Sequence, residues 1–162
     1  MQRISDVAIE RLPQDFGRWR ELLALIRKSF AYMDGIIDPP SSARLLTADS
    51  LREKAGDETC FLAVDGTRLA GCVFAAERSD ALYIGKLAVD PALQSLGIGR
   101  ALVGAVESLA LRMGKPALEL QTRIELTDNH AAFRRMGFVE VGRTAHPGFD
   151  RPTSITFRKP LA

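Results

Sequence analysis

The residues whose types and spacing could support chemistry lie between positions 94 and 100, in a glycine-containing loop. The loop reads Gln94-x-x-Gly97-x-Gly99, follows the apolar segment 87–89 and an Asp-Pro pair, and runs into a helical pattern. A helix that begins here leaves its first N–H groups unpaired at the positive end of the helix dipole. Such a terminus binds phosphate without a charged side chain. The sequence therefore predicts an anion site in this loop.

Known kinds of glycine loop differ in the residues that accompany the glycines. A Walker loop needs Lys and then Ser or Thr after its last glycine, where this chain has Arg100 and Ala101. A dinucleotide-binding fingerprint needs a third glycine, where this chain has Leu102. A turn that only starts a helix does not need Gly97 and Gly99, because glycine weakens a helix start. The pattern favours a phosphate site of another kind.

Composition limits the class of protein. The chain has 162 residues, is 46% hydrophobic and carries a formal net charge of +2 from 22 basic and 20 acidic residues. This length and balance predict one domain over residues 1–162 and argue against a nucleic-acid partner. No segment has the length of a membrane span or the pattern of a signal peptide, which predicts a cytoplasmic protein without a membrane partner. The two cysteines and two histidines show no zinc-site spacing, so no metal is expected.

Hydrophobic periodicity and turn residues predict the elements that position the loop. Strands are expected at 7–12, 60–64, 69–76, 82–89, 118–122, 138–142 and 153–158, and helices at about 15–32, 47–55, 97–113 and 129–136. Asp65-Gly66 joins the second and third strands as a hairpin, and residues 34–42 form a proline-containing turn. This order predicts an α+β fold whose sheet is part antiparallel and part parallel.

The predicted helices carry local signals at their ends and faces. Asp15 is the expected N-cap of the first, Thr47 or Asp49 of the second and Asp128 of the fourth, which Gly137 ends. The third helix has one apolar face, formed by Ile98, Leu102, Val106, Leu109 and Met113.

Three segments of the chain together resemble the GNAT superfamily of acyl-coenzyme A-dependent N-acetyltransferases. They are Leu87-Ala88-Val89-Asp90-Pro91, the loop 94–99, and the block NHAAFRRMGF at 129–138. The resemblance covers most of the chain from about Cys60 onward and is weaker across residues 16–51. It implies a GNAT-like α+β fold with a mixed, mostly antiparallel sheet of about seven strands and about four flanking helices. It also implies acetyl-CoA as the cofactor and a sheet splayed at the cofactor-binding strand.

The resemblance assigns cofactor-binding roles to two regions. The coenzyme pyrophosphate would sit on the N–H groups of residues 95–100, and the pantetheine arm would pair with the backbone of residues 87–89. The cofactor-binding residues are Leu87, Ala88, Val89, Gln94, Ser95, Leu96, Gly97, Ile98, Gly99, Arg100, Asn129 and Phe133. The N–H of Val89 would also face the thioester oxygen as a catalytic donor. Asn129 has an equal alternative role as a helix cap.

The proton chemistry is less complete than the cofactor site. Many family members carry a Tyr acid at the position of Phe133, which cannot donate a proton. Tyr83, six residues before Val89, is a second catalytic candidate that could hold a relay water, provided that strand alternation puts both on one face. An equal alternative for Tyr83 is a purely structural role as a half-buried aromatic residue of the strand. His130 reads best as a surface helix residue, whereas the loop around His146 could border the acceptor pocket.

In this fold the acceptor is generally recognised by the first two helices and the loop before the last strand. Tyr32, Asp34 and Asp38 are the candidate substrate-binding residues, and the acids would attract a cationic amine. Ordinary turn chemistry explains the same Asp residues equally well. Cys60 and Cys72, placed in strands, make poor nucleophiles.

The leading prediction is therefore direct acetyl transfer from acetyl-CoA to a primary amine of a small molecule or peptide. The alternative is a non-catalytic acyl-CoA sensor, which the missing Tyr favours. A homodimer is compatible with either. The sequence reveals neither the acceptor nor the acyl chain length.

Overall fold

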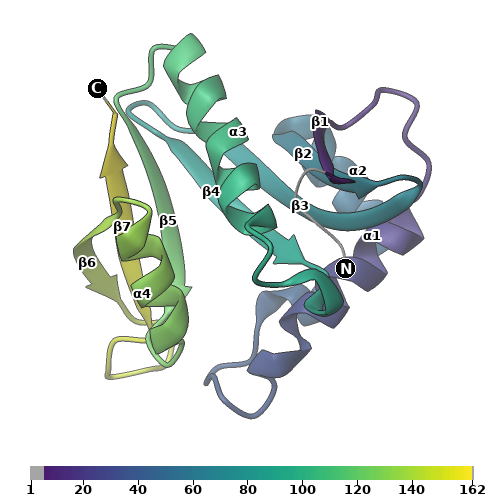
Figure 1. Ribbon diagram of the computed structural model, residues 1–162. Helices are drawn as coiled ribbons and strands as arrows, with labels where there is room; N and C mark the ends of the chain where they lie inside the picture. Colours follow the sequence, from purple (N-terminus) through teal and green to yellow (C-terminus); the bar gives the residue numbers. More distant parts are fainter. Residues whose placement is uncertain (1–5, 162) are drawn as a thin grey trace.

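A computed structural model describes residues 6–161 and contains one seven-stranded mixed sheet (Figure 1). The strand order is β1-β2-β3-β4-β5-β7-β6, and β4–β5 is the one parallel pair. The strands are β1 (Ala8–Arg11), β2 (Thr59–Asp65), β3 (Arg68–Glu77), β4 (Leu82–Val89), β5 (Ala117–Arg123), β6 (Val139–Thr144) and β7 (Ser154–Pro160). The predicted order of elements and the mixed, mostly antiparallel sheet are confirmed.

Four α-helices flank the sheet (Figure 1). They are α1 (Trp19–Phe30), α2 (Ala48–Asp57), α3 (Ile98–Arg112) and α4 (Thr127–Arg135). The 3₁₀ segments η2 (Ala31–Met33) and η3 (Ser42–Leu45) lie between α1 and α2, and η4 (Pro91–Leu93) lies between β4 and α3. The α+β class predicted from the sequence is therefore confirmed, with the expected number of helices.

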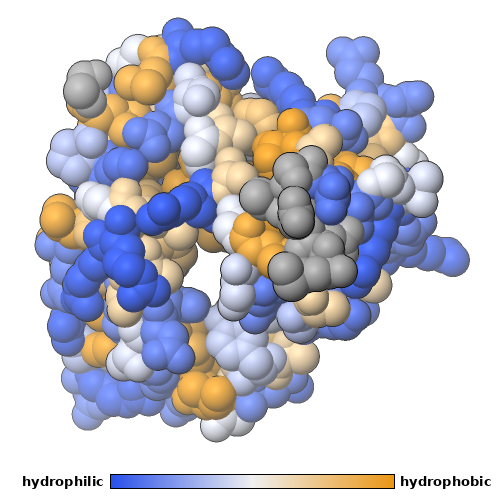
Figure 2. All heavy atoms as spheres, viewed as in Figure 1, coloured by the Kyte–Doolittle hydropathy of each residue, from blue (hydrophilic) through white to orange (hydrophobic). Residues whose placement is uncertain are grey.

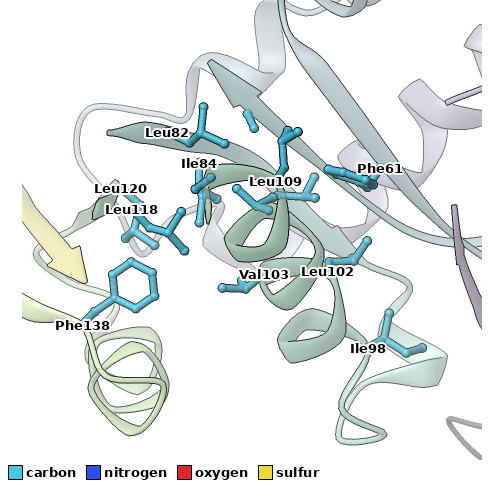
Figure 3. Packing of buried hydrophobic residues seen from close by; sticks show 14 of the residues in the cluster. Phe61, Leu82, Ile84, Ile98, Leu102, Val103, Leu109, Leu118, Leu120 and Phe138 are labelled. Atoms are coloured by element: carbon cyan, nitrogen blue, oxygen red, sulfur yellow. The ribbon is translucent and has the colours of Figure 1, made fainter. Parts of the chain in front are cut away.

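Two apolar clusters cover opposite faces of the sheet. One packs α3 against strand residues such as Leu82, Ile84 and Leu118, and it extends to Phe138 beside α4 (Figure 3). The other packs α1 and α2 against the opposite face and contains both free cysteines. Strand β3 is buried over most of its length because it contributes to both clusters. Both cysteines are free and buried, on the neighbouring strands β2 and β3.

The sheet opens beyond the first half of β4. Only Leu82, Tyr83 and Ile84 pair with β5, and from there the two strands diverge (Figure 1). On the other edge of β4, Cys72 pairs with Ala88 and Phe74 with Gly85, so one residue of β3 faces two of β4. This extra residue is a β-bulge, which bends a strand and increases its twist. The splayed strand that the family resemblance implies is therefore present.

Several predictions about helix ends were wrong. The N-cap of α1 is Arg18, not Asp15, and the N-cap of α4 is Leu126, which leaves Asp128 inside the first turn. A carboxylate in that turn still interacts favourably with the helix dipole. Met113 is 40% exposed because α3 ends at Arg112, before the apolar stripe reaches it.

The start of α2 follows the sequence prediction. Thr47 accepts a hydrogen bond from the N–H of Ser50, and the Ser50 hydroxyl oxygen accepts from the N–H of Thr47. This reciprocal capping box pairs two N–H groups that a helix start otherwise leaves unpaired. Thr47, rather than Asp49, is therefore the cap.

Candidate functional site

A cleft of about 1680 Å³ lies where β4 and β5 diverge. Its walls come from the end of α1, η2, η3, the exposed edge of β4, the loop before α3, the end of β5, and α4. Figure 2 shows that this opening passes through the molecule between its two halves. The cleft therefore joins the predicted phosphate loop to the segments expected to bind the acceptor.

Most of the predicted site residues line this cleft. They are Tyr32, Tyr83, Leu87, Val89, Gln94, Ser95, Gly97, Ile98, Gly99, Arg100, Asn129 and Phe133. Ala88 does not, because it belongs to the buried cluster under α1 and pairs with Cys72. Leu96 packs against the α3 core instead.

The acidic acceptor candidates lie outside the cleft lining. Asp38 forms an ion pair with Arg151 at 3.3 Å, and its N–H donates to Glu125 at 3.0 Å. Asp34 is the exposed residue after η2. Neither acid lines the cleft, so their role in attracting a cationic acceptor stays a prediction.

The loop 94–99 has a backbone shape that glycine makes accessible. Ser95 and Gly97 have φ values of 71° and 84°, and Gly97 is the N-cap of α3. A residue with a side chain is disfavoured at an N-cap with this left-handed backbone. The backbone conformation alone therefore explains the glycine at 97, and no ligand needs to be invoked. Gly99 differs, because it sits inside the helix start and a Cβ there would meet only Val89 Cγ2, at 3.8 Å. Packing does not require glycine at 99, so a close-approaching ligand explains it better.

The exposed edge of β4 carries a hydrogen bond to α1. Asp90 N–H donates to Ala70 O, and Ala88 pairs with Cys72, so the N–H of Val89 points away from β3. That N–H donates to the buried hydroxyl oxygen of Ser29 at 3.2 Å. The catalytic donor predicted at Val89 is thus on the cleft edge but already has a partner.

Tyr83 and Val89 lie on opposite faces of the sheet. They are six residues apart on β4, yet their β3 partners Ala76 and Gly71 are five apart, because the bulge adds one residue. The condition of unbroken alternation therefore fails. Both still line the cleft, since it runs around the exposed edge of β4. Burial raises the pKa of Tyr83, while the Arg78 guanidinium over its ring, 4.6 Å from the centroid, opposes this effect.

Two aromatic residues occupy the wall formed by α4 and η2. The Asn129 side-chain amide donates to the hydroxyl of Tyr32 at 3.1 Å, linking α4 to the end of α1 across the cleft. Asn129 therefore does not cap α4. Phe133 packs edge-on against Phe138 at 5.8 Å, so the position to which the family resemblance assigns a Tyr acid belongs to an aromatic cluster.

The segment between η2 and η3 closes the same end of the cleft. The Arg123 guanidinium donates to the carbonyls of Pro39 at 2.8 Å and Pro40 at 3.1 Å. Arg151 and Glu125 hold Asp38, as described above. These contacts fasten the loop after α1 to the end of β5 and to the β6–β7 connection.

The two histidines have different environments. His130 is buried, with Nε2 2.8 Å from the carbonyl of Arg123, so its assignment to the helix surface was wrong. His146 lines the cleft, as expected for a loop that borders the acceptor, and its Nδ1 contacts Thr153 Oγ1. Burial and the nearby Arg123 cation lower the pKa of His146, which keeps its imidazole neutral near pH 7.

Three cleft residues escaped the sequence reasoning. Ser29 ends an amphipathic helix, Lys86 interrupts an apolar strand, and Arg123 ends β5. A lysine at position 86, between glycine and leucine, was the one local signal that pointed to a function. The partners of Ser29 and Arg123 are too distant in the sequence to be read from it.

Two other kinds of feature are absent from the described part of the chain. No helix of residues 6–161 is long and apolar enough to cross a membrane. The same residues contain no group of three or more His, Cys, Asp or Glu side chains that could hold a metal ion.

Comparison with solved structures shows the same fold. A ribosomal-protein-S18-alanine N-acetyltransferase from Escherichia coli is 20% identical, with a TM-score of 0.73 over 96% of this chain and 94% of its own. An acetyltransferase from Streptococcus agalactiae 2603 is 15% identical, with a TM-score of 0.76 over 96% and 99%. A protein of Bacillus anthracis solved in complex with acetyl coenzyme A is 18% identical, with a TM-score of 0.61 over 65% and 63%.

Sequence comparison assigns the family. No curated protein sequence matches the chain. Residues 19–138 match the acetyltransferase (GNAT) family, which uses acetyl-CoA as its acyl donor, in agreement with the predicted cofactor. This match spans well over half of the chain, and the fold and the cleft agree with it. The chain therefore belongs to the GNAT acetyltransferase family.

Proposed function

We propose that this protein transfers an acetyl group from acetyl-CoA directly to a primary amine of a small molecule or peptide. The observation that carries the proposal is the single cleft that joins the start of α3 to the exposed edge of β4. In this proposal residues 1–162 form one domain. A homodimer is compatible with the proposal.

The residues at the donor end of the cleft fit a coenzyme A molecule. The N–H groups at the start of α3 can receive its pyrophosphate, and a glycine at 99 leaves room for it. The edge of β4 at Leu87–Val89 lacks a pairing strand on the β5 side and can pair with the pantetheine amides. Arg100 and Arg135, which also line the cleft, add positive charge near the phosphates. When bound, acetyl-CoA supplies an activated acetyl thioester.

The backbone of β4 can stabilise the reacting carbonyl. Val89 N–H is aimed at the cleft edge and can donate to the thioester oxygen once Ser29 releases it. A fixed N–H donor is effective there because it needs no reorganisation during the reaction.

Two side chains in the cleft can handle protons. Tyr83 keeps its hydroxyl proton at neutral pH because burial raises its pKa, so it can hold a water or donate a proton but cannot act as a base. His146 is neutral near pH 7, with Nδ1 against Thr153, and its other ring nitrogen can accept a proton from the amine. Phe133 can do neither.

The thiols do not support a two-step transfer through cysteine. Burial raises the pKa of Cys60 to about 12 and the pKa of Cys72 well above its usual value. A nucleophilic cysteine needs its thiolate, so direct transfer within a ternary complex is the expected route.

The second candidate is a non-catalytic acyl-CoA sensor, which the aromatic cluster around Phe133 favours. Thiol release from acetyl-CoA, measured with polyamines, aminoglycosides, amino acids and short peptides, separates the two functions. We expect release that depends on one class of amine. Tight coenzyme binding without release from any acceptor would support the sensor instead.

A further inference from the structure

Lys86 occupies an unusual position at the β-bulge of β4. Its φ is 47°, in the left-handed region that residues with a side chain rarely adopt, and such strain concentrates at functional sites. Its ammonium group reaches η3, where Nζ donates to the hydroxyl oxygen of Ser42 at 3.2 Å. Lys86 and Ser42 both line the cleft, on the side of the sheet covered by α1 and α2.

The charge of Lys86 has no counter-ion among the residues that the structure describes. Among residues 6–161, no carboxylate lies within 4.0 Å of its ammonium group, and that group donates to a neutral hydroxyl. Lys86 is half-buried, so part of its hydration is lost without an ion pair in return. Burial and the nearby Lys54 and Arg123 cations lower its pKa, which shows the same cost, while Glu58 opposes it.

The carboxylates near Lys86 are already committed. Glu58 pairs with Lys54 at 2.8 Å. Asp38 and Glu125 interact with Arg123 instead, and neither lines the cleft. The cleft therefore contains a cation whose partner the chain does not supply.

Most of the charged side chains that line the cleft are basic. One acid, Asp128, appears in its lining, against six basic side chains, namely Arg44, Lys54, Lys86, Arg100, Arg123 and Arg135. Arg100 and Arg135 belong to the donor end, on α3 and α4. Of the remainder, Lys54 pairs with Glu58, and Arg123 faces Glu125 and Asp38. Arg44 and Lys86 have no ion pair among residues 6–161, so a purely cationic acceptor such as a polyamine would be repelled beside η3.

Building on the proposed function, we infer that the acceptor is an amine that also carries an acidic group, and that Lys86 binds this group together with Ser42. The acid would complete the ion pair that the fold lacks, and its attraction to the basic entrance would guide the amine toward the edge of β4. An amino acid or a related amino acid-like molecule has this combination. A carboxylate and a phosphate share the required charge and acceptor oxygens.

The test compares acceptors that share one amine and one carbon skeleton. An amino acid, its carboxamide, the amine without the acid and the corresponding aminophosphonate are assayed by thiol release. We expect kcat/KM for an acidic form to exceed that for the amide by about 10- to 100-fold, the range of one charge-assisted hydrogen bond. The carboxylate and phosphonate arms identify which acid fits. Equal values for the acid and the amide would overturn the inference.

Variants of Lys86 separate charge from structure. Lys86→Met should remove the preference for the acid, and Lys86→Arg should keep most of it. Lys86→Gly removes the charge and relieves the left-handed backbone, so its loss of preference could not come from strain. Arg112→Met, which removes one exposed charge at the end of α3 away from the cleft, is the matched control. An unchanged acid preference in both Lys86→Met and Lys86→Gly would contradict the assignment.

A binding measurement keeps this test independent of turnover. Calorimetric titration of the acid and its amide into protein saturated with coenzyme A reports the acid site even when no acetyl group is transferred. Tighter binding of the acid without thiol release would support the anion site and overturn the proposed transferase. Thiol release together with equal binding of the acid and the amide would support the proposed transferase and overturn the anion site.

Discussion

The backbone N–H of Val89 donates to the hydroxyl oxygen of Ser29 over 3.2 Å, joining the cleft edge of β4 to the last turn of α1. A thioester carbonyl that accepts from this N–H must replace the serine oxygen. The free protein thus carries a hydrogen bond that competes with its donor substrate. Ser29 becomes a determinant of donor affinity, although it lies 60 residues from Val89 in the chain.

Removing this competition should strengthen donor binding. Ser29→Ala frees the Val89 N–H, so we expect the Kd for acetyl-CoA to fall about threefold to tenfold, the range of one net hydrogen bond. The free protein should lose about 1 kcal/mol of unfolding free energy. Calorimetry and chemical denaturation measure the two effects. Ser108→Ala, at an exposed position of α3, is the control, and weaker donor binding in Ser29→Ala would contradict the prediction.

Gly99 allows stability and binding to be separated. Gly99→Ala should raise the free energy of unfolding by about 0.5–1 kcal/mol, because alanine is the better helix former and its Cβ meets only Val89. The same Cβ should weaken acetyl-CoA binding by about tenfold by crowding the phosphates. Gly104 lies in the same helix, and a Cβ there meets nothing within 4 Å. Gly104→Ala should therefore stabilise the protein without affecting acetyl-CoA binding. Equal acetyl-CoA affinity of the two variants would show that the loop is misassigned.

Tyr83 should contribute through its proton. Tyr83→Phe is expected to lower kcat by about tenfold or more while leaving the Kd for acetyl-CoA unchanged. The raised pKa keeps the phenol protonated at neutral pH, so activity that depends on it falls only on the alkaline side. A pH–rate profile identical to that of the unaltered protein would remove Tyr83 from the mechanism.

His146 should set the acidic limit of activity. Its pKa is lowered from 6.5, so the neutral base is present at and above that pH and is lost as the pH falls through the lowered value. His146→Gln should abolish this acidic limb of kcat/KM, measured from pH 5 to 8. If the limb persists in the variant, another group accepts the proton.

The cysteines should be inert. Because burial raises the pKa of Cys60 to about 12 and that of Cys72 well above its usual value, neither forms thiolate at pH 8. Iodoacetamide at pH 8 should leave both unmodified in the folded protein, as judged by intact mass. Labelling should become complete in denaturant, and rapid modification of the native protein would argue for an exposed, reactive thiol.

Local chemistry explains which features could be predicted from the sequence. The glycine loop, the hairpin at Asp65-Gly66 and the Thr47 cap each depend on neighbours a few residues away, so their patterns were sufficient. Ser29 with Val89 and Asp38 with Arg151 join residues 60 and 113 positions apart, which no local pattern encodes. The bulge at Lys86 inserts one residue and so places Tyr83 on the face of the sheet opposite to Val89. The position of the bulge depends on the pairing of β4 with β3.

The loop between η2 and η3 also affects how the donor and the acceptor enter and leave the cleft. Three residue pairs between β4 and β5 close one side of the opening in Figure 2, and the contacts of Arg123 and Asn129 close the other. As long as these contacts hold, a molecule that extends through the opening would have to leave lengthwise. The donor and the acceptor can approach from opposite mouths of this passage without blocking each other. A long product would then have to pass end-first through the opening, and the position of the loop between η2 and η3 would set the width of that opening.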